Sequence, residues 1–127
     1  MLPTMAAHQK QNMRDHLVAV QEVIAALSTA NFAGVEAAAQ RLGFSESMGQ
    51  MCTHMGAGAR GFSDQAIEFH HTADRIAAAA RERNAGEVLM ALGTTLQACT
   101  SCHAVWKQQV VDEPTWQRLA SARGAAP

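Results

Sequence analysis

The chain has 127 residues, of which 48% are hydrophobic and 17% are charged, and its formal net charge at neutral pH is −1. These values indicate one globular domain that can bury a core of its own, and they exclude a disordered chain. The near-neutral charge provides no basic field for nucleic acid. No apolar run approaches the ~20 residues that cross a bilayer, so we expect no membrane span. The first residues also lack the charged start and apolar middle of a signal peptide.

The distribution of proline predicts an all-α protein. Proline occurs only at positions 3, 114 and 127, so the stretch from Thr4 to Glu113 contains none. Alanine, the residue with the highest helix propensity, is abundant in this stretch, whereas proline has the lowest. No alternating segment bounded by turn residues suggests a strand hairpin.

Apolar spacing predicts the first two helices. The first covers about residues 5–29, followed by a break at Asn31 and Gly34. The second covers about residues 33–42, and Gly43 is well placed as its C-terminal cap. The inward face of the first helix has steps of 4, 3, 4 and 3 between its members, which are Met13, Leu17, Val20, Ile24 and Leu27.

A short helical segment and a flexible connection follow. Ser47 and Gln50 have the spacing of a capping box, which predicts a short helical turn through Met55. Three closely spaced glycines then indicate a flexible connection. They are Gly56, Gly58 and Gly61.

The third and fourth helices have the clearest stripes. Ser63 or Asp64 is expected to cap a third helix that runs to about Asn84, where a turn through Gly86 begins. Its inward residues are Ala66, Phe69, Ala73, Ile76 and Ala80. The fourth helix is predicted from about Glu87 to just before Pro114. Its inward stripe is Leu89, Leu92, Leu96, Cys99, His103, Trp106 and Val110.

Four helices with such stripes and short connections predict an antiparallel four-helix bundle. We expect a single domain over residues 1–127, with its core in about residues 5–112. Residues 115–119, which include Trp116, form a short C-terminal extension with a small helix, and the tail from Ala120 onward is expected to be loose.

The segment Cys99-Thr100-Ser101-Cys102-His103 has the CxxCH pattern. Two cysteines three residues apart can each form a thioether with one haem vinyl group, and the histidine that follows can bind the iron. The pattern therefore predicts one covalently bound haem c, held by Cys99 and Cys102 with His103 as axial iron ligand. Cys99 and His103 lie on the inward stripe, so the haem is expected inside the bundle.

These cysteines have two other possible functions, in thiol redox chemistry and in zinc binding. A thioredoxin-like CxxC requires a βαβ setting, and none is visible in the sequence. A zinc site requires a second ligand pair, for which Cys52 and His54 have an awkward spacing.

The late position of the motif adds a family resemblance. The segment from Cys99 to His103, followed by Trp106 and Lys107, resembles the haem motif of the cytochrome c′ family, the class II cytochromes c. That family usually has Tyr or Phe where this chain has Trp106. The resemblance covers roughly residues 5–112, and it is specific only at the haem motif.

The resemblance also makes the first helix informative, because a residue there faces the open side of the haem in the family. Low-spin members place methionine at this position and transfer electrons, whereas high-spin members place an apolar side chain there and bind nitric oxide or carbon monoxide. The segment around Met13 resembles the low-spin branch, which makes Met13 the expected second iron ligand. His16 is the alternative, followed by Met48, Met51 and Met55, and Met13 can also be mere core filler.

Other residues have weaker expectations. Arg14 and Lys107 are candidate partners of the haem propionates, with solvated surface positions as the alternative. Cys52 is expected to be an unpaired buried thiol, with a disulfide between two copies as the alternative. Of His70 and His71 we expect one packed and one solvated side chain.

The resemblance implies a periplasmic single-electron carrier with one His/Met-ligated haem. Its iron would change oxidation state with its ligands in place, and no catalysis is expected, since no acid–base pair is evident. Redox partner proteins and a homodimer are the implied partners. The alternatives are a high-spin cytochrome c′ that binds nitric oxide, and a haem-free helical interaction or thiol-redox module.

Overall fold

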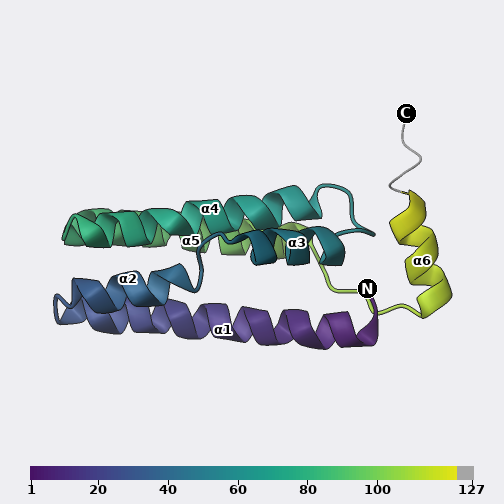
Figure 1. The fold of residues 1–127 in the computed structure, drawn as a ribbon, viewed down its shortest axis with the longest axis horizontal. Helices are drawn as coiled ribbons and strands as arrows, with labels where there is room; N and C mark the ends of the chain where they lie inside the picture. Colours follow the sequence, from purple (N-terminus) through teal and green to yellow (C-terminus); the bar gives the residue numbers. More distant parts are fainter. Residues whose placement is uncertain (123–127) are drawn as a thin grey trace.

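The computed structural model describes residues 1–122, and this part of the chain is entirely helical (Figure 1). The predicted all-α class is therefore confirmed, with six helices and no strand in the described range. The helices are α1 (Pro3–Ser28), α2 (Phe32–Gln40), α3 (Glu46–Met55), α4 (Phe62–Arg81), α5 (Ala85–Val105) and α6 (Glu113–Ser121).

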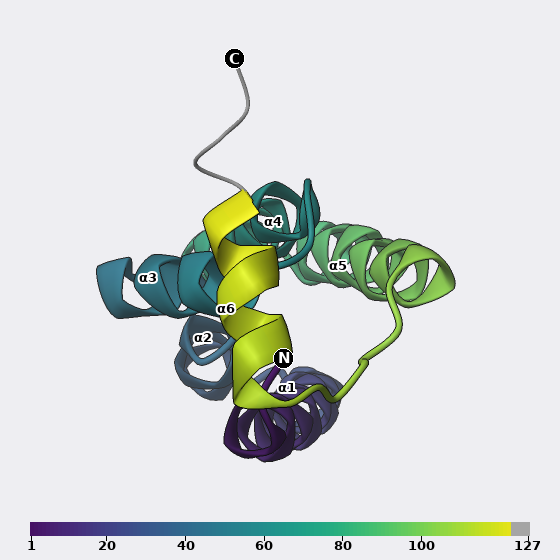
Figure 2. The ribbon, with the colours of Figure 1, turned by 90° about the vertical axis from the view of Figure 1, so that its right-hand side faces the viewer.

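The helices form a bundle around α4. Helices α2, α3 and α5 each pack against α4, and α1 packs against α2. The long helices α1, α4 and α5 run lengthwise, and α2 and α3 follow one another along the same direction (Figure 1). Helix α6 crosses one end, near the N-terminus (Figures 1 and 2). Helices α1 and α5 are not among the pairs that pack closely on each other.

The main core consists largely of alanine and valine side chains. Small side chains let helix backbones approach closely, and their burial removes apolar surface from water. The largest fully buried members are Val23, Val35, Leu42, Ile76 and Val88. They come from α1, α2, the segment just after α2, α4 and α5. This core therefore joins helices α1, α2, α4 and α5.

Two of the helix connections have the same construction. Ala30, after α1, and Arg83, after α4, both adopt the left-handed conformation, with φ of 53° and 54°. The N–H groups of the next residues, Asn31 and Asn84, reach back to the carbonyls of Ala26 and Ala79 at 2.9 and 3.2 Å. These are Schellman-type ends, in which late carbonyls of the helix are satisfied.

Each asparagine in these turns also starts the next helix. The side chain of Asn31 accepts a hydrogen bond from the N–H of Gly34, and that of Asn84 accepts one from the N–H of Glu87. The predicted break at Asn31 is therefore confirmed. The turn predicted through Gly86 was placed too late, because Asn84 already caps α5.

The inward face predicted for α1 is wrong, because each residue that faces the bundle lies one position before the predicted one. Val20 is buried and Leu27 half-buried, but Met13, Leu17 and Ile24 are 41%, 68% and 51% exposed. Small residues allow the close approach of α1 to α2. The polar members of the actual inward line have partners in α3, in α4 and in the segment after α5. The line is Met5, Gln9, Asn12, His16, Ala19, Val23 and Ala26.

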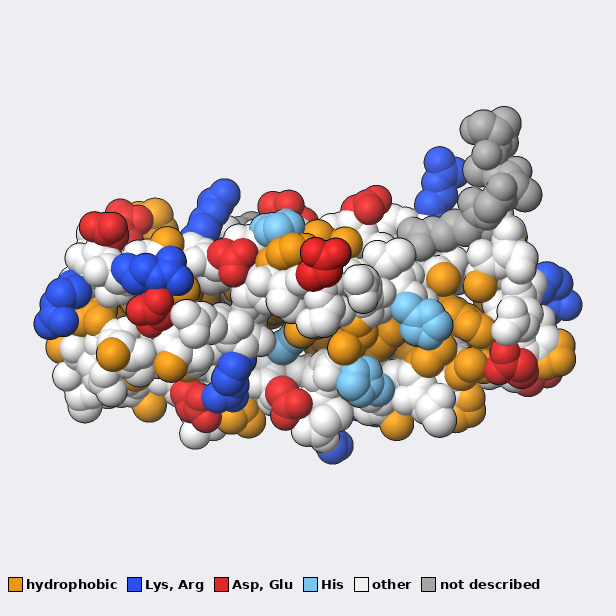
Figure 3. Space-filling view, in the orientation of Figure 1, with side chains coloured by type: hydrophobic (Ala, Val, Ile, Leu, Met, Phe, Trp, Pro, Cys, Tyr) orange, Lys and Arg blue, Asp and Glu red, His pale blue; other side chains and the backbone are white. Residues whose placement is uncertain are grey.

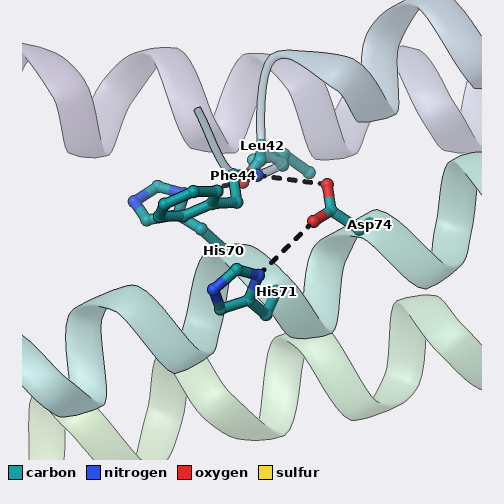
Figure 4. Close-up of polar contacts among 5 residues, drawn as sticks. All are labelled: Leu42, Phe44, His70, His71 and Asp74. Atoms are coloured by element: carbon teal, nitrogen blue, oxygen red, sulfur yellow. Dashed lines mark hydrogen bonds and ion pairs between the residues drawn. The ribbon is translucent and has the colours of Figure 1, made fainter. Parts of the chain in front are cut away.

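The connection between α2 and α3 is held by α4. His70 Nδ1–H donates to the Leu42 carbonyl at 2.7 Å, and Asp74 Oδ1 accepts from the Phe44 N–H at 3.1 Å (Figure 4). His71 stacks on Phe44, with ring centroids 4.3 Å apart. His70 is buried and His71 exposed, as predicted for this pair.

The predicted caps of this region need correction. Gly43 does not cap α2, whose C-cap is Arg41; instead Gly43 is buried against Asp74, and a Cβ atom there would overlap the carboxylate. Helix α3 begins earlier than predicted, because Ser45 rather than Ser47 accepts the hydrogen bond from the Met48 N–H. Gly43 is thus required for its contact with Asp74, and the Ser45 hydroxyl sets the start of α3.

Helix α4 begins at Phe62, one or two residues before the predicted caps, Ser63 and Asp64. Gly61 stands at its N-cap with φ of 86°, a left-handed conformation that favours glycine. The predicted inward stripe of α4 is confirmed for three buried members, Ala73, Ile76 and Ala80. Its other two members, Ala66 and Phe69, are half-buried.

Helix α5 ends at Val105, well before the predicted end near Pro114. Trp106 is extended, with φ of −103° and ψ of 131°, and the chain stays non-helical through the N-cap of α6, Asp112. Tertiary contacts hold this segment, as described below. The small helix predicted after Pro114 is confirmed as α6. The loose tail predicted from Ala120 onward is wrong for Ala120 and Ser121, which belong to α6, and residues 123–127 lie outside the described residues.

Helix α5 is long and apolar enough to cross a membrane by length and composition, and it is the one such helix in residues 1–122. Its 18-residue window has a mean hydropathy of 1.2, and 22% of that window is buried. Thr94, Thr95 and Gln97 interrupt its apolar residues, so the helix contains no uninterrupted apolar run of spanning length. That the chain has no membrane span stays a prediction.

Candidate haem-attachment site

The CxxCH motif occupies the last two turns of α5. Cys99 and Cys102 are one helical turn apart, both are half-buried, and neither is in a disulfide. His103 is exposed in the final turn, and no hydrogen bond or ion pair to another described side chain engages its ring. The donor set needed for covalent haem attachment therefore lies on one short piece of helix with its sulfur and nitrogen atoms free.

The surroundings of the two thiols disfavour the thiolate. Burial raises the pKa of Cys99 and of Cys102 above the ordinary thiol value, and the neighbouring thiol Cys102 adds to the rise at Cys99. Reactive cysteines of thiol-redox sites have lowered pKa values, commonly at a helix N-terminus. The C-terminal end of a helix has the opposite dipole, so the position of this motif does not suit a reactive dithiol.

The stripe that carries the motif is buried only in part. Leu92 is buried against α4, but Leu89 and Leu96 are 58% and 39% exposed, and Val110 lies outside the helix and is exposed. The predicted inward position is therefore wrong for Leu89, Leu96, His103 and Val110. The line that packs on α4 is Val88, Leu92 and Thr95. Leu89 and Leu96 form an exposed apolar strip beside it, the α5 strip, and His103 follows on the same flank.

A matching strip runs along α1. Met13, Leu17 and Ile24 are exposed at steps of four and seven residues, which places them on one flank of the helix, the α1 strip. Ala6 lies two turns before Met13 on the same flank, and its carbonyl accepts a hydrogen bond from Gln108 at 3.0 Å. Since Gln108 belongs to the segment after α5, the α1 strip lies on the side of α1 toward the end of α5.

The segment from Trp106 to Val111 leads from α5 to α6, and on its way it is hydrogen-bonded to the start of α1 (Figure 2). Gln108 also bonds to Gln9, and the Val111 N–H donates to the Met1 carbonyl at 3.0 Å. This connection, which we call the linker, was not foreseen. Its glutamines and β-branched valines gave no turn signal, and its conformation depends on α1, which is about a hundred residues away in the sequence.

Trp106 fixes the end of α5 to the beginning of α4. Its Nε1–H donates to Gln65 Oε1 at 2.7 Å, and its ring meets Phe62 edge-on, with centroids 5.7 Å apart. The half-buried indole thus anchors the backbone three residues after His103. The sequence singled out Trp106 but not its two partners on α4.

His16 lies on the neighbouring line of α1 and faces α4. Its ring is 5.3 Å from that of Phe69 and 5.5 Å from that of His70, measured between centroids. Burial, and then the nearby His70, lower the pKa of His16 to about 4. Burial also lowers the pKa of His70. Both imidazoles are therefore neutral at pH 7, and the Phe69–His16–His70 cluster lies between α1 and α4.

The remaining predicted residues are less engaged. Arg14 and Lys107 are exposed, and neither forms an ion pair with a residue in the described range. Cys52 is a free buried thiol, as expected, and burial raises its pKa. Met55 is buried in a second cluster at the end of the bundle, and Met48 and Met51 are half-buried on the same helix.

A comparison with protein families, curated proteins and solved structures found no significant match for this chain.

Proposed function

We propose that this chain is a c-type cytochrome that carries one haem on Cys99 and Cys102, with His103 as an iron ligand. The observation that carries the proposal is the CxxCH motif at the end of α5, with two free thiols and an unengaged imidazole on adjacent turns. Each thiol would add to one vinyl group of the haem, and the ring of His103 would bind the iron.

The apolar strips support a haem between α1 and α5. A haem presents two large apolar faces, and the α1 strip and the α5 strip are apolar surfaces without a packed helix to cover them. Both belong to elements that the linker ties together at one end. The chemistry of the donors and the exposed side chains beside them thus fit the group.

Met13 is the proposed second iron ligand. Its thioether is on the α1 strip, on the flank that faces the end of α5, and it has no hydrogen-bonding partner in the described chain. Met51, by contrast, already accepts contacts from His8 and Asn12, and Met55 is buried elsewhere. His16 is the alternative, since it is neutral, but it packs between Phe69 and His70.

With His103 and Met13 as ligands, the haem would accept and release one electron at a time. The chain's residues would keep the ligands in place in both oxidation states, because Trp106 anchors the end of α5 on Gln65 and Phe62. A thioether ligand, and apolar surroundings from residues such as Leu92, Leu96 and Phe69, would favour the ferrous state of the bound group and raise its potential. Arg14 and Lys107, both exposed cations, would be free to pair with the propionates.

The finer fold assignment belongs to the same proposal. If α2 and α3 together count as the second member, the helices correspond to an antiparallel four-helix bundle of the cytochrome c′ type, in its low-spin branch. Covalent haem of this kind matures outside the bacterial inner membrane, which favours a periplasmic electron carrier. Redox partner proteins, and a second copy of the chain as in many members of that family, are the proposed partners.

Optical spectra test the function. Expressed with a c-type maturation system, the chain should have the sharp ferrous bands of low-spin haem and should not bind nitric oxide readily. Met13→Ala should become high-spin and bind nitric oxide, while the exposed Met90 on α5 provides the control variant Met90→Ala, which should stay low-spin.

Other outcomes of this experiment overturn parts of the proposal. A Met13→Ala spectrum identical to that of the parent would overturn Met13 as ligand, and loss of the low-spin spectrum in His16→Ala alone would assign the role to His16. A high-spin parent that binds nitric oxide would overturn electron transfer in favour of gas binding.

A further inference from the structure

Thioether sulfurs gather where α3, α1 and α6 meet. Met5 and Met55 are buried there with Trp116, and Met1 and Met51 pack against them. On the face drawn in Figure 3, hydrophobic side chains gather between α1 and α3 toward the N-terminal end, with histidines beside them. Helix α3 alone has a dense run of soft donors, which are Met48, Met51, Cys52, His54 and Met55.

One contact in this region brings an imidazole to a thioether. His8 Nε2 of α1 lies 3.2 Å from Met51 Sδ of α3, and Asn12 Nδ2 donates to the same sulfur at 3.1 Å. His8 is exposed and Met51 half-buried, so the pair is open to solvent on one side and backed by the methionine cluster on the other. His8 and Asn12 are on a different flank of α1 from Met13.

These donors select a particular kind of ion. Thioether sulfur is a soft ligand that suits Cu(I), whereas zinc, magnesium and calcium prefer histidine, thiolate or oxygen ligands. No group of three His, Cys, Asp or Glu side chains in residues 1–122 could hold a metal ion. A metal that binds here must therefore accept thioethers.

The separation of the two donor atoms suits a shared ion after a small movement. With metal–ligand bonds of about 2.0–2.3 Å, two ligands at a trigonal or tetrahedral angle are roughly 3.5–3.8 Å apart. His8 Nε2 and Met51 Sδ are 3.2 Å apart, and both side chains lie at the edge of the cluster, where they can rotate about their χ angles. With its proton on Nδ1, the His8 ring offers the Nε2 lone pair toward the sulfur.

We propose that His8 Nε2 and Met51 Sδ bind Cu(I), with a second thioether from Met5 or Met55 completing a three-coordinate site. Met5 lies one turn before His8 on α1, and Met55 lies one turn after Met51 on α3, and both pack in the cluster that Met51 joins. Asn12 would not bind the ion, since a carboxamide nitrogen is not a soft ligand, and its contact to Met51 Sδ would be given up when the ion binds.

Competition with bicinchoninate, which forms a coloured Cu(I) complex, tests the site. The reduced protein is used as isolated and without oxygen, and the Cys99→Ala/Cys102→Ala chain is measured in parallel, so that these two sulfur atoms contribute no copper ligand in one of the two samples. The parent chain should withdraw one equivalent of Cu(I), and His8→Ala and Met51→Leu should each weaken binding at least tenfold.

Two matched variants distinguish ligation from packing. Asn12→Ala removes the other contact to Met51 Sδ, and Met90→Leu removes an exposed thioether on α5; both should keep the affinity within about twofold. Met5→Leu and Met55→Leu are compared as separate variants, and the one that loses more Cu(I) affinity identifies the third ligand. Cys52→Ser should have no effect, and a tenfold loss in that variant would overturn the thioether site in favour of a thiolate.

Failure of the parent chain to compete with bicinchoninate would overturn the proposal, as would equal losses in His8→Ala and Asn12→Ala. X-ray absorption of the Cu(I) complex gives a second test that requires no variant. Scattering from two sulfurs and one imidazole nitrogen supports the site, and its absence contradicts it. None of these results depends on whether Cys99 and Cys102 hold a haem.

Discussion

The same two helices behave differently on their two flanks. One flank of α1 and of α5 packs into the alanine- and valine-rich core around Val23, Ile76 and Val88. The other flank of each helix, the open flank, leaves apolar side chains such as Leu17 and Leu96 exposed, and His103 of the CxxCH motif lies on the open flank of α5. Equal apolar spacing along a helix therefore predicts an apolar surface, but it does not specify whether protein or a cofactor covers that surface.

The packed flank should contribute most to stability. Ile76 is fully buried in the main core, and Ile76→Ala should lower the free energy of unfolding by about 2–5 kcal/mol, because it leaves a cavity. Urea unfolding followed by circular dichroism measures the change. Met90→Ala, at an exposed position of α5, should change it by less than about 0.5 kcal/mol; similar losses in both variants would contradict a packed core on this flank.

The contact between α1 and α4 beside the packed flank should respond to pH. The pKa of His16 is lowered to about 4 and that of His70 is also lowered, so the unfolded chain binds more protons than the folded one below about pH 6.5. Stability is therefore fully present above pH 6.5 and decreases as the pH falls toward 4, by roughly 1–2 kcal/mol for a partly exposed pair.

Chemical denaturation at several pH values checks this decrease. The double variant His16→Asn/His70→Asn should lose less stability between pH 7 and pH 4.5 than the parent does. An unchanged slope in the double variant would show that other groups cause the acid sensitivity.

The open flank should gain its packing from haem. Leu17→Ala should cost less than about 0.5 kcal/mol in the haem-free chain, where this side chain is 68% exposed, and about 1 kcal/mol or more with haem bound. The neighbouring Val18 is also exposed but lies on another flank, so Val18→Ala is the matched control. Thermal unfolding of both forms gives the comparison, and equal effects of Leu17→Ala with and without haem would refute it.

The smallest effect concerns the two turns that follow α1 and α4. Ala30 and Arg83 have left-handed backbone conformations that are unfavourable for residues other than glycine. Ala30→Gly and Arg83→Gly should each stabilise the chain by about 0.5–1 kcal/mol. Gly86→Ala serves as a control, because Gly86 is in the first turn of α5 and has no left-handed conformation to relieve. Destabilisation by both Ala30→Gly and Arg83→Gly would contradict the assigned left-handed conformations.

The helices and the core could be predicted from the sequence where local signals agree. The absence of proline and the stripe of Ala73, Ile76 and Ala80 gave α4 correctly, and the CxxCH spacing alone identified Cys99, Cys102 and His103 as candidate ligands. These signals depend on residues within a few turns of one another.

Features that depend on distant residues could not be predicted. Helix α5 ends at Val105 because Trp106 and Gln108 bind Gln65 and Ala6, which lie far away in the sequence. The rotation of α1 depends on its close packing against α2, and the Met51–His8 contact depends on the way α3 returns to α1.

Haem staining of a denaturing gel tests the central claim most directly, because thioether-bound haem survives denaturation. The chain expressed with a c-type maturation system should stain at its own mass, and the Cys99→Ala/Cys102→Ala variant, expressed to the same level, should not. An unstained parent chain, or a double variant that stains as strongly as the parent, would contradict haem attachment at the end of α5.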